Sequence, residues 1–304
     1  MTRRAPVLAL VAAAVSWGVA TTGTKYALGG LGPLSLLTFE LVLATAVLWA
    51  VTALRGFHRP SSLVRVTLMG LCEPAIAYLS QTLGLTRTSA TDGALIQGLE
   101  SVFVVILAAV LLHEAIGRSV AVAVVLATVG LVVLEGGGSI AGPGLGDALV
   151  LFGALSAAAY TILARGLAPE DDPLSVTALQ FAVAAVASLP LGLFAVTRGG
   201  EPDPAAVSGS FLVVAALVGV VGYAGSFLLY NRAITSVRAA PAAVIINLIP
   251  AVGFLSAVVL LGEPLTPYDV GGALLICASV AVFTMLEASS VRAGSAARST
   301  PACV

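Results

Sequence analysis

The sequence predicts an all-α membrane protein with ten transmembrane helices in two inverted five-helix repeats. Three features predict it: an extreme composition, a series of apolar runs of membrane-spanning length, and a similarity between the two halves. Of the 304 residues, 59% are hydrophobic and only 10% are charged, whereas about 25% of the residues of an ordinary soluble domain are charged. A soluble chain of this length needs a charged surface, so the composition excludes that class. The net charge of −1 provides no basic field for nucleic acid.

The apolar runs are each close to the roughly 20 residues that a membrane helix needs. We expect spans over residues 6–28, 33–54, 63–83, 89–112, 118–136, 145–167, 174–197, 209–231, 239–261 and 268–288. Short segments rich in Gly, Pro and charge, such as 55–60 and 169–173, separate them. Arg3 and Arg4 precede the first run as in a signal peptide. That run continues through Trp17-Gly18 to Lys25 without a convincing small-residue cleavage site, so we expect it to be retained as the first helix.

The basic residues predict the orientation of the chain in an inner (plasma) membrane. With a cytoplasmic N-terminus, eleven of them face the cytoplasm: Arg3, Arg4, Arg55, Arg59, Arg65, Arg118, Arg165, Arg232, Arg238, Arg292 and Arg298. Only Lys25, Arg87 and Arg198 then face the outside. This bias follows the positive-inside rule and favours an even number of spans, with both termini in the cytoplasm. From Ser289 onward the chain is rich in Ala, Ser and Arg, so we expect a disordered tail.

The two halves of the chain are similar to each other. Residues 85–114 align without gaps with residues 234–263 at an offset of 149, and Ser16 and Lys25 match Ser156 and Arg165 at an offset of 140. The predicted organisation is a first repeat over 1–140, a second over 141–288, and a tail over 289–304. Because each repeat holds five spans, the second copy is inverted in the membrane, an arrangement typical of secondary carriers.

Several short motifs follow one another in a recognisable order. They are Ser16-Trp17-Gly18 with the later Lys25, then Tyr78, Gln81, Gly84-Leu85, Thr88-Ser89-Ala90, Leu99-Glu100 and Glu114, and, in the second half, Gly146-Asp147, Tyr160, Arg165, Asn247, Pro250 and Gly262-Glu263. Over residues 6–288 this pattern resembles the EamA-type branch of the drug/metabolite transporter superfamily. The chain departs from that pattern at Ser101, where the family usually has Pro, at Glu40, where Arg is common, and at Ala157, where the second Trp is replaced.

The resemblance implies a fold and a role. Members of the family export amino acids, metabolites or drugs through a central cavity lined by helices 1, 3, 4, 6, 8 and 9, and they do not share one substrate.

Two carboxylates in the middle of predicted spans are the main candidates for a site. Glu73 and Glu100 lie in the third and fourth spans. Placing an ionisable group in the hydrocarbon layer costs several kcal/mol, so such a residue usually has a structural or functional role. Gln97, Glu100 and Ser101 share one face of their helix, as do Glu73 and Gln81. Facing the interior, the carboxylates could bind a cationic group or carry a proton, and both are candidates for proton coupling. The alternative is a structural carboxyl group bonded to a neighbouring helix.

Aromatic and amide side chains complete the candidate substrate-binding set. Its members are Trp17, Glu73, Tyr78, Gln81, Gln97, Glu100, Tyr160, Tyr223 and Asn247. Pro250 could create a gating kink in the ninth span. The aromatic residues recur at helical spacing, which is also typical of simple packing.

Three further carboxylates have other predicted roles. Glu40, in the second span, lies outside the helices expected to line the cavity, so we expect a structural or peripheral role. Glu114 and Glu263 end their spans, where we expect them to fix loops at the membrane interface.

The sequence offers no catalytic site. Gly144-Leu145-Gly146-Asp147 and Tyr268-Asp269 resemble intramembrane aspartyl protease motifs, but in reversed order and at helix starts, where Asp complements the helix dipole. There is no His-Glu-x-x-His site, no Gly-x-Ser-x-Gly elbow and no Walker loop, so the chain alone is not an ATP-driven pump. The three cysteines have no metal-binding spacing. We therefore expect no enzyme, no cofactor and no metal.

These observations together predict a secondary active transporter that exports small metabolites, amino acids or drugs by alternating access. Proton coupling is a hypothesis that rests on the buried carboxylates. The alternatives are a channel-like facilitator and a non-transporting membrane scaffold. The predicted partners are a small-molecule substrate and the lipid bilayer, without nucleic acid; the sequence fixes neither the substrate nor the oligomeric state.

Overall fold

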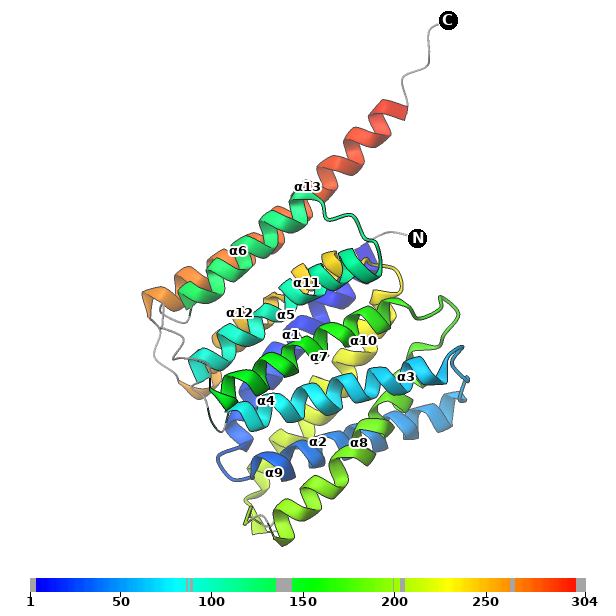
Figure 1. The fold of residues 1–304 in the computed structure, drawn as a ribbon. Helices are drawn as coiled ribbons and strands as arrows, with labels where there is room; N and C mark the ends of the chain where they lie inside the picture. The colour runs from blue at the N-terminus through cyan, green and yellow to red at the C-terminus, as the bar shows by residue number, and fades with distance from the viewer. Residues whose placement is uncertain are drawn as a thin grey trace, which may run out of the picture.

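The protein is a bundle of long helices that run roughly along one common direction (Figure 1). The computed structural model describes residues 4–85, 87, 90–134, 144–198, 200–202, 206–262 and 266–298, and over these residues it contains helices and loops but no strand. The helices are α1 (Arg4–Ala27), α2 (Pro33–Arg55), α3 (Leu63–Gly70), α4 (Ala77–Leu85), α5 (Ala90–Leu111), α6 (Arg118–Leu134), α7 (Leu145–Arg165), α8 (Pro173–Thr197), α9 (Gly209–Leu217), α10 (Ser226–Ile234), α11 (Ala239–Ile246), α12 (Leu248–Leu261) and α13 (Pro267–Arg298). Two widened helical turns, η1 (Leu71–Ile76) and η3 (Val218–Gly225), join α3 to α4 and α9 to α10.

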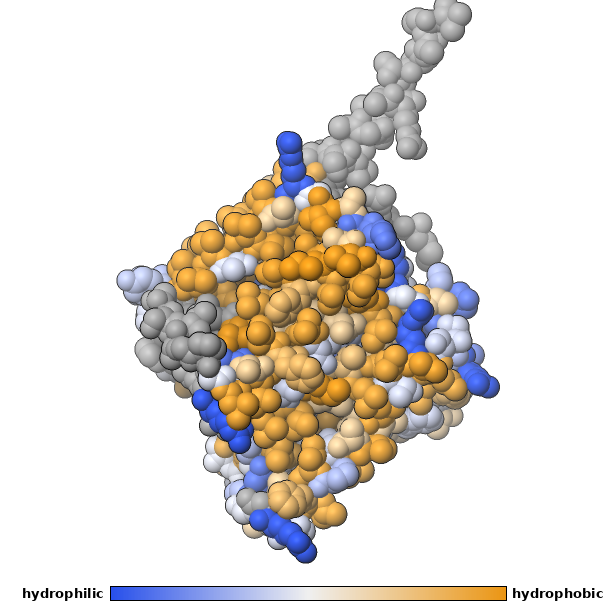
Figure 2. Space-filling view, in the orientation of Figure 1, coloured by the Kyte–Doolittle hydropathy of each residue, from blue (hydrophilic) through white to orange (hydrophobic). Residues whose placement is uncertain are grey.

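The outer surface of the bundle is apolar. Figure 2 shows a broad hydrophobic band across one face, with hydrophilic residues gathered toward the ends of the helices. Large side chains such as Leu54, Val186 and Val259 are more than two-thirds exposed, which in water would be unfavourable but in lipid is the expected arrangement. The protein is therefore a multi-pass membrane protein.

Each of the ten predicted ranges is helical over most of its length, but not all are equally long. Among the described residues, seven apolar helical segments are long enough to cross a membrane: Ala5–Ala27, Pro33–Arg55, Leu63–Gly84, Leu145–Arg165, Pro173–Thr197, Gly209–Ile234 and Ala239–Leu261. Three shorter apolar helices cover Ile96–Leu111, Arg118–Val133 and Val270–Phe283.

Helices of the two halves pack against each other reciprocally. In the first half, α1 packs against α10 and α12 of the second half, while α7 of the second half packs against α4 and α5 of the first. On opposite sides of the bundle, α2 pairs with α8, and α6 with α13 (Figure 1). The centre of the bundle is thus formed by α1, α7 and the helices that they contact.

The widened turns η1 and η3 occupy corresponding positions in the two halves. Gly70 packs its backbone on the carbonyl oxygen of Gln180, where an added Cβ would lie 2.4 Å from that oxygen, and Gly219 packs in the same way on Glu40, with 2.7 Å to its carbonyl oxygen. Only glycine permits so close an approach of two helices.

A serine hydroxyl from the opposite half donates to a backbone carbonyl of each turn. Ser156 donates to Cys72 at 2.8 Å, and Ser16 donates to Val221 at 3.1 Å. Cys72 and Val221 are 149 residues apart and the two serines are 140 apart, so these contacts follow the two sequence offsets.

One loop contact anchors the end of the bundle where α8 begins. The Asp171 carboxylate accepts hydrogen bonds from the backbone and hydroxyl of Ser61, at 2.7 and 2.8 Å, and from the backbone of Ala168 at 2.9 Å. Partial burial raises the pKa of Asp171, but these hydrogen bonds and the Arg65 charge together outweigh it, so the pKa lies below its usual value.

The C-terminal segment differs from the prediction. The sequence predicted a disordered tail from Ser289, but α13 continues as a helix to Arg298. Residues 289–298 contain no proline and include Ala and Arg, which favour helix, and they extend an existing helix without a new nucleation cost. Residues 299–304 lie outside the described residues.

Candidate functional site

An aromatic cluster occupies the centre of the bundle around Phe227 of α10. The rings of Trp17, Phe181 and Tyr160 have their centroids 5.0, 5.2 and 5.5 Å from that of Phe227, and Tyr78 lies 6.3 Å away. These rings come from α1, α8, α7 and α4. The cluster therefore joins both halves of the chain.

Two more tyrosines extend the cluster. Tyr230 lies 5.7 Å from both Trp17 and Tyr160, and Tyr223 of η3 lies 5.0 Å from Tyr78. Trp17, Tyr78 and Tyr223 are only half-buried although they pack against the main core.

The Glu73 and Glu100 carboxylates lie beside this cluster and repel each other electrostatically. Glu73 stands in η1 with an extended backbone (φ −151°, ψ 130°), which interrupts the helix at the residue before Pro74. Glu100 accepts a hydrogen bond of 2.9 Å from the Gln97 amide. Both carboxylates are half-buried. In the described part of the chain, neither forms an ion pair with Lys or Arg.

The tyrosines surround the two carboxylates. Tyr78, Tyr160 and Tyr230 each interact electrostatically with Glu73. The arrangement combines two carboxyl groups that form no ion pair within the described residues with aromatic faces, and carboxylates and aromatic faces both attract cations.

A buried hydrogen-bond network supports the site from behind. Asn231 accepts from the Tyr160 hydroxyl at 2.8 Å and donates to Thr177 at 3.0 Å and to the Gln180 amide oxygen at 3.1 Å. Gln180 in turn donates to the backbone carbonyl of Glu73 at 3.1 Å. Gln180 and Asn231 are 0% and 1% exposed. The network thus fixes the backbone that carries the Glu73 carboxylate.

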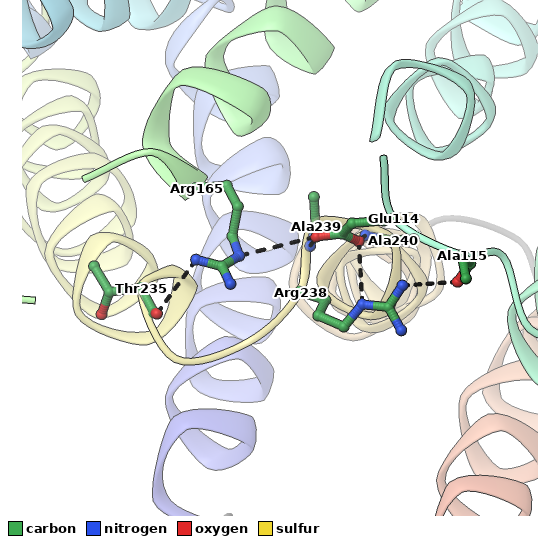
Figure 3. Close-up of polar contacts among 7 residues, drawn as sticks. All are labelled: Glu114, Ala115, Arg165, Thr235, Arg238, Ala239 and Ala240. Atoms are coloured by element: carbon green, nitrogen blue, oxygen red, sulfur yellow. Dashed lines mark hydrogen bonds and ion pairs between the residues drawn. The ribbon is translucent and has the colours of Figure 1, made fainter. Parts of the chain in front are cut away.

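A second polar cluster ties together helix ends at one end of the bundle (Figure 3). The Glu114 carboxylate accepts from the backbone N–H groups of Ala239 and Ala240, at 3.1 and 3.3 Å, at the N-terminus of α11. It also pairs with Arg165 of α7 at 3.9 Å and with Arg238 at 3.6 Å.

The two arginines extend these contacts to neighbouring carbonyls. Arg238 donates to the Ala115 carbonyl at 2.7 Å, and Arg165 donates to the Thr235 carbonyl at 3.5 Å. Glu114 therefore links helices of both halves and fixes loops, as the sequence predicted. Glu263 lies outside the described residues.

Comparison with known proteins gives the family. The model of the EamA-like transporter family matches residues 4–135 and again residues 144–285. The chain belongs to the EamA-like transporter family. This confirms the resemblance that the motifs suggested, and the family implies transport of a small molecule in a lipid bilayer.

Three curated proteins and one solved structure are similar to this chain. An uncharacterized transporter of Archaeoglobus fulgidus is 25% identical over 265 residues, which is 86% of this chain and 91% of that protein. The uncharacterized transporter YyaM of Bacillus subtilis is 26% identical over 84% of this chain and 86% of its own length. A WAT1-related chloroplastic protein of Arabidopsis thaliana is 30% identical over 53% of this chain and 41% of its own. One solved crystal structure, 20% identical, shares the fold with a TM-score of 0.76 over 94% of this chain and 98% of that chain.

In this EamA-like transporter, most of the predicted site residues come together. Trp17, Tyr78, Tyr160 and Tyr223 belong to the aromatic cluster, and Glu73, Gln97 and Glu100 lie beside it.

Gln81, Asn247 and Pro250 take no part in these contacts within the described structure. Gln81 packs against α7 at Gly153. Asn247 lies at the break between α11 and α12, with its buried amide nitrogen unpartnered, and Pro250 follows in the first turn of α12. Within the described residues, no ring contact or hydrogen bond joins these side chains to the aromatic cluster.

Glu40 is nearer to the site than the sequence predicted. Its side chain is 1% exposed, and Tyr223 and Thr24 face its carboxyl group. Helix α2 packs against η3 through Gly219, so the second span borders the site instead of lying apart from it.

Sequence reasoning also missed Gln180 and Asn231. For Gln180 the available signal was a lone amide in the otherwise apolar stretch 178–187, since polar groups within membrane helices are rare and usually bonded. Asn231 lies between Tyr230 and Arg232 and gave no such signal. No group of three or more His, Cys, Asp or Glu side chains in the described structure could hold a metal ion.

Proposed function

We propose that this protein is a secondary active transporter that exports small metabolites, amino acids or drugs by alternating access around a site at the centre of the bundle. The observation that carries this proposal is the pair Glu73 and Glu100. These two carboxyl groups form no ion pair within the described residues, and aromatic rings from both halves surround them. A charged group inside a membrane protein costs several kcal/mol unless it is neutralised. Either a proton or a cationic substrate supplies that neutralisation.

This competition defines a mechanism and a substrate class. When a cation enters, the carboxylates release protons, and when the substrate leaves, they bind protons again; the exchange couples export to the proton gradient. The cation is held by the carboxylate charge and by the faces of Trp17 and the surrounding tyrosines. We therefore favour amines and amino acids with a free ammonium group as substrates.

Alternating access then follows from relative motion of the two halves. The reciprocal packing of α1 and α7 and the paired serine contacts support ten spans in two inverted repeats. With the N-terminus in the cytoplasm of a cell with an inner (plasma) membrane, the Glu114 cluster lies at the cytoplasmic end. Breaking the contacts of Glu114 with α7 and with α11 opens the site to that side. The break at Asn247 and the adjacent Pro250 provide a hinge in the ninth span.

Flux measurements in proteoliposomes test the proposal. Purified protein faces a panel of amino acids, nucleosides, amines and cationic drugs, with a pH-sensitive dye inside the vesicles. We expect saturable flux with counter-movement of protons, lost in Glu73→Gln or Glu100→Gln. The matched control is Glu170→Gln, because Glu170 is an exposed loop carboxylate. Flux without saturation supports a channel-like facilitator, and equal flux in all variants contradicts the role of the carboxylates. Absence of flux with folded protein supports a scaffold.

A further inference from the structure

Glu40 and Gln180 are structural counterparts in the two halves. They are 140 residues apart, the same offset as Ser16 and Ser156. Gly219 packs on the backbone of Glu40 as Gly70 packs on the backbone of Gln180, and these glycines are 149 residues apart. Both side chains are fully buried, at 1% and 0% exposure.

The two side chains differ in how well they are bonded. The Gln180 amide donates to the Glu73 carbonyl and accepts from Asn231, so both of its ends are paired. Among the described residues, one carboxyl oxygen of Glu40, Oε1, is buried and has no partner at ordinary hydrogen-bond geometry, and the polar groups that face the carboxyl group are the hydroxyls of Tyr223 and Thr24. A protonated carboxyl group has the same shape as an amide and carries one donor. A proton on Glu40 would therefore make it equivalent to Gln180.

The surroundings of Glu40 favour that neutral form. Tyr223 of η3 is the titratable group that acts on it, and Thr24 of α1 is the other polar neighbour. Within the described residues, the contacts of α2 with α4, α8 and α9 bring no charged side chain to the carboxyl group. A buried carboxylate without a cation is unfavourable.

Tyr223 connects Glu40 with the substrate site. Its side chain interacts with Glu40 on one side, while its ring lies 5.0 Å from that of Tyr78, which in turn interacts with Glu73 and Glu100. A change of charge on Glu40 therefore acts on a ring that borders the central site.

We propose that Glu40 is a proton-binding residue of this transporter, a carboxylic acid that replaces the amide of the other half and is coupled to the central site through Tyr223. The coupling to transport rests on the proposed function above. In the cycle, the O–H bond of Glu40 breaks and its proton passes to water in the opened site. The carboxylate that remains is compensated by the bound cation, and a proton returns from water when the cation leaves.

Infrared spectroscopy tests the proton on Glu40 without any substrate. We expect the carbonyl stretching band of a protonated carboxyl group at neutral pH in the purified protein, and loss of part of this band in Glu40→Gln. Glu170→Gln serves as the control and leaves the band unchanged. Because Glu40→Gln places the same amide as Gln180 at an equivalent buried position, we expect the variant to keep the fold. An unchanged band in Glu40→Gln overturns the proposal.

The coupling has its own readout. The chain has two tryptophans, so Trp49→Phe leaves Trp17, a member of the aromatic cluster, as the only indole. We expect a pH-dependent change in its fluorescence that is smaller in Glu40→Gln and in Tyr223→Phe than in the parent protein, but unaltered in Glu170→Gln. A change of the same size and midpoint in both variants as in the parent protein overturns the coupling. In proteoliposomes, Glu40→Gln is expected to bind tetraphenylphosphonium as the parent protein does, but to move fewer protons per substrate, because only Glu73 and Glu100 still exchange them. Proton movement equal to that of the parent protein contradicts the role in transport, while the infrared result stands separately.

Discussion

Replacing Asn231 by leucine removes the centre of the buried network behind the site. Asn231 makes three hydrogen bonds, to Tyr160, Thr177 and Gln180, at 2.8, 3.0 and 3.1 Å. Hydrogen bonds within membrane proteins contribute about 0.6 kcal/mol each. Losing three of them is therefore expected to lower the free energy of unfolding by about 2 kcal/mol. The buried hydroxyl and amide left without partners raise the loss to about 4 kcal/mol.

Unfolding of the purified protein in mixed detergent micelles measures this loss as a change in the free energy of unfolding. The control is Thr128→Val, because within the described residues Thr128 bonds only to the Val124 carbonyl of its own helix, at 2.8 Å. We expect that control to change stability by less than about 0.5 kcal/mol. Since Gln180 loses its support, Asn231→Leu should also weaken substrate binding through Glu73. If Asn231→Leu costs no more than Thr128→Val, the network does not hold the site and the reasoning is refuted.

Three further predictions concern the ends and the packing of the bundle. Glu114→Ala removes the acceptor of two α11 amides, a cap that contributes about 1 kcal/mol. Hydrogen exchange at these amides should therefore rise about fivefold, and unchanged exchange would contradict a stabilising role of Glu114 at this helix end. Gly70→Ala places a Cβ 2.4 Å from the Gln180 carbonyl oxygen and should destabilise by about 1–3 kcal/mol, whereas Gly209→Ala, in open space, should be neutral in the same unfolding assay. Because its pKa is lowered, Asp171 stabilises the fold above its unfolded pKa, and this stability is lost as pH falls through the folded pKa. Asp171→Asn should therefore flatten the acid side of the unfolding profile, and an unaltered profile would contradict this.

The sequence predicted the helices and much of the site because both depend on local patterns. Apolar runs of sufficient length form helices wherever they lie, and the isolated carboxylates Glu73 and Glu100 could be read directly from an apolar background. The offsets of 140 and 149 predicted that the halves correspond, and the paired contacts of Ser16 and Ser156 follow those offsets.

The parts that could not be predicted depend on how distant helices meet. Gln180 reaches the Glu73 carbonyl across 107 positions of sequence, and no local pattern specifies that contact. Glu40 was assigned a peripheral role because the second span was expected outside the cavity; the close approach at Gly219 brings it to Tyr223. The tail beyond Ser289 was expected to be disordered because of its composition. Composition takes no account of the preceding helix, which the tail extends to Arg298.

Accumulation against a gradient tests the central claim most directly. Vesicles containing the protein receive an imposed pH gradient and the best substrate of the amine and amino acid panel, and the internal concentration is followed over time. The account predicts accumulation above the external concentration, abolished when the pH gradient is collapsed and absent in Glu73→Gln and Glu100→Gln. Simple equilibration, or accumulation that survives in both variants, would contradict a proton-coupled carrier built on these two carboxylates.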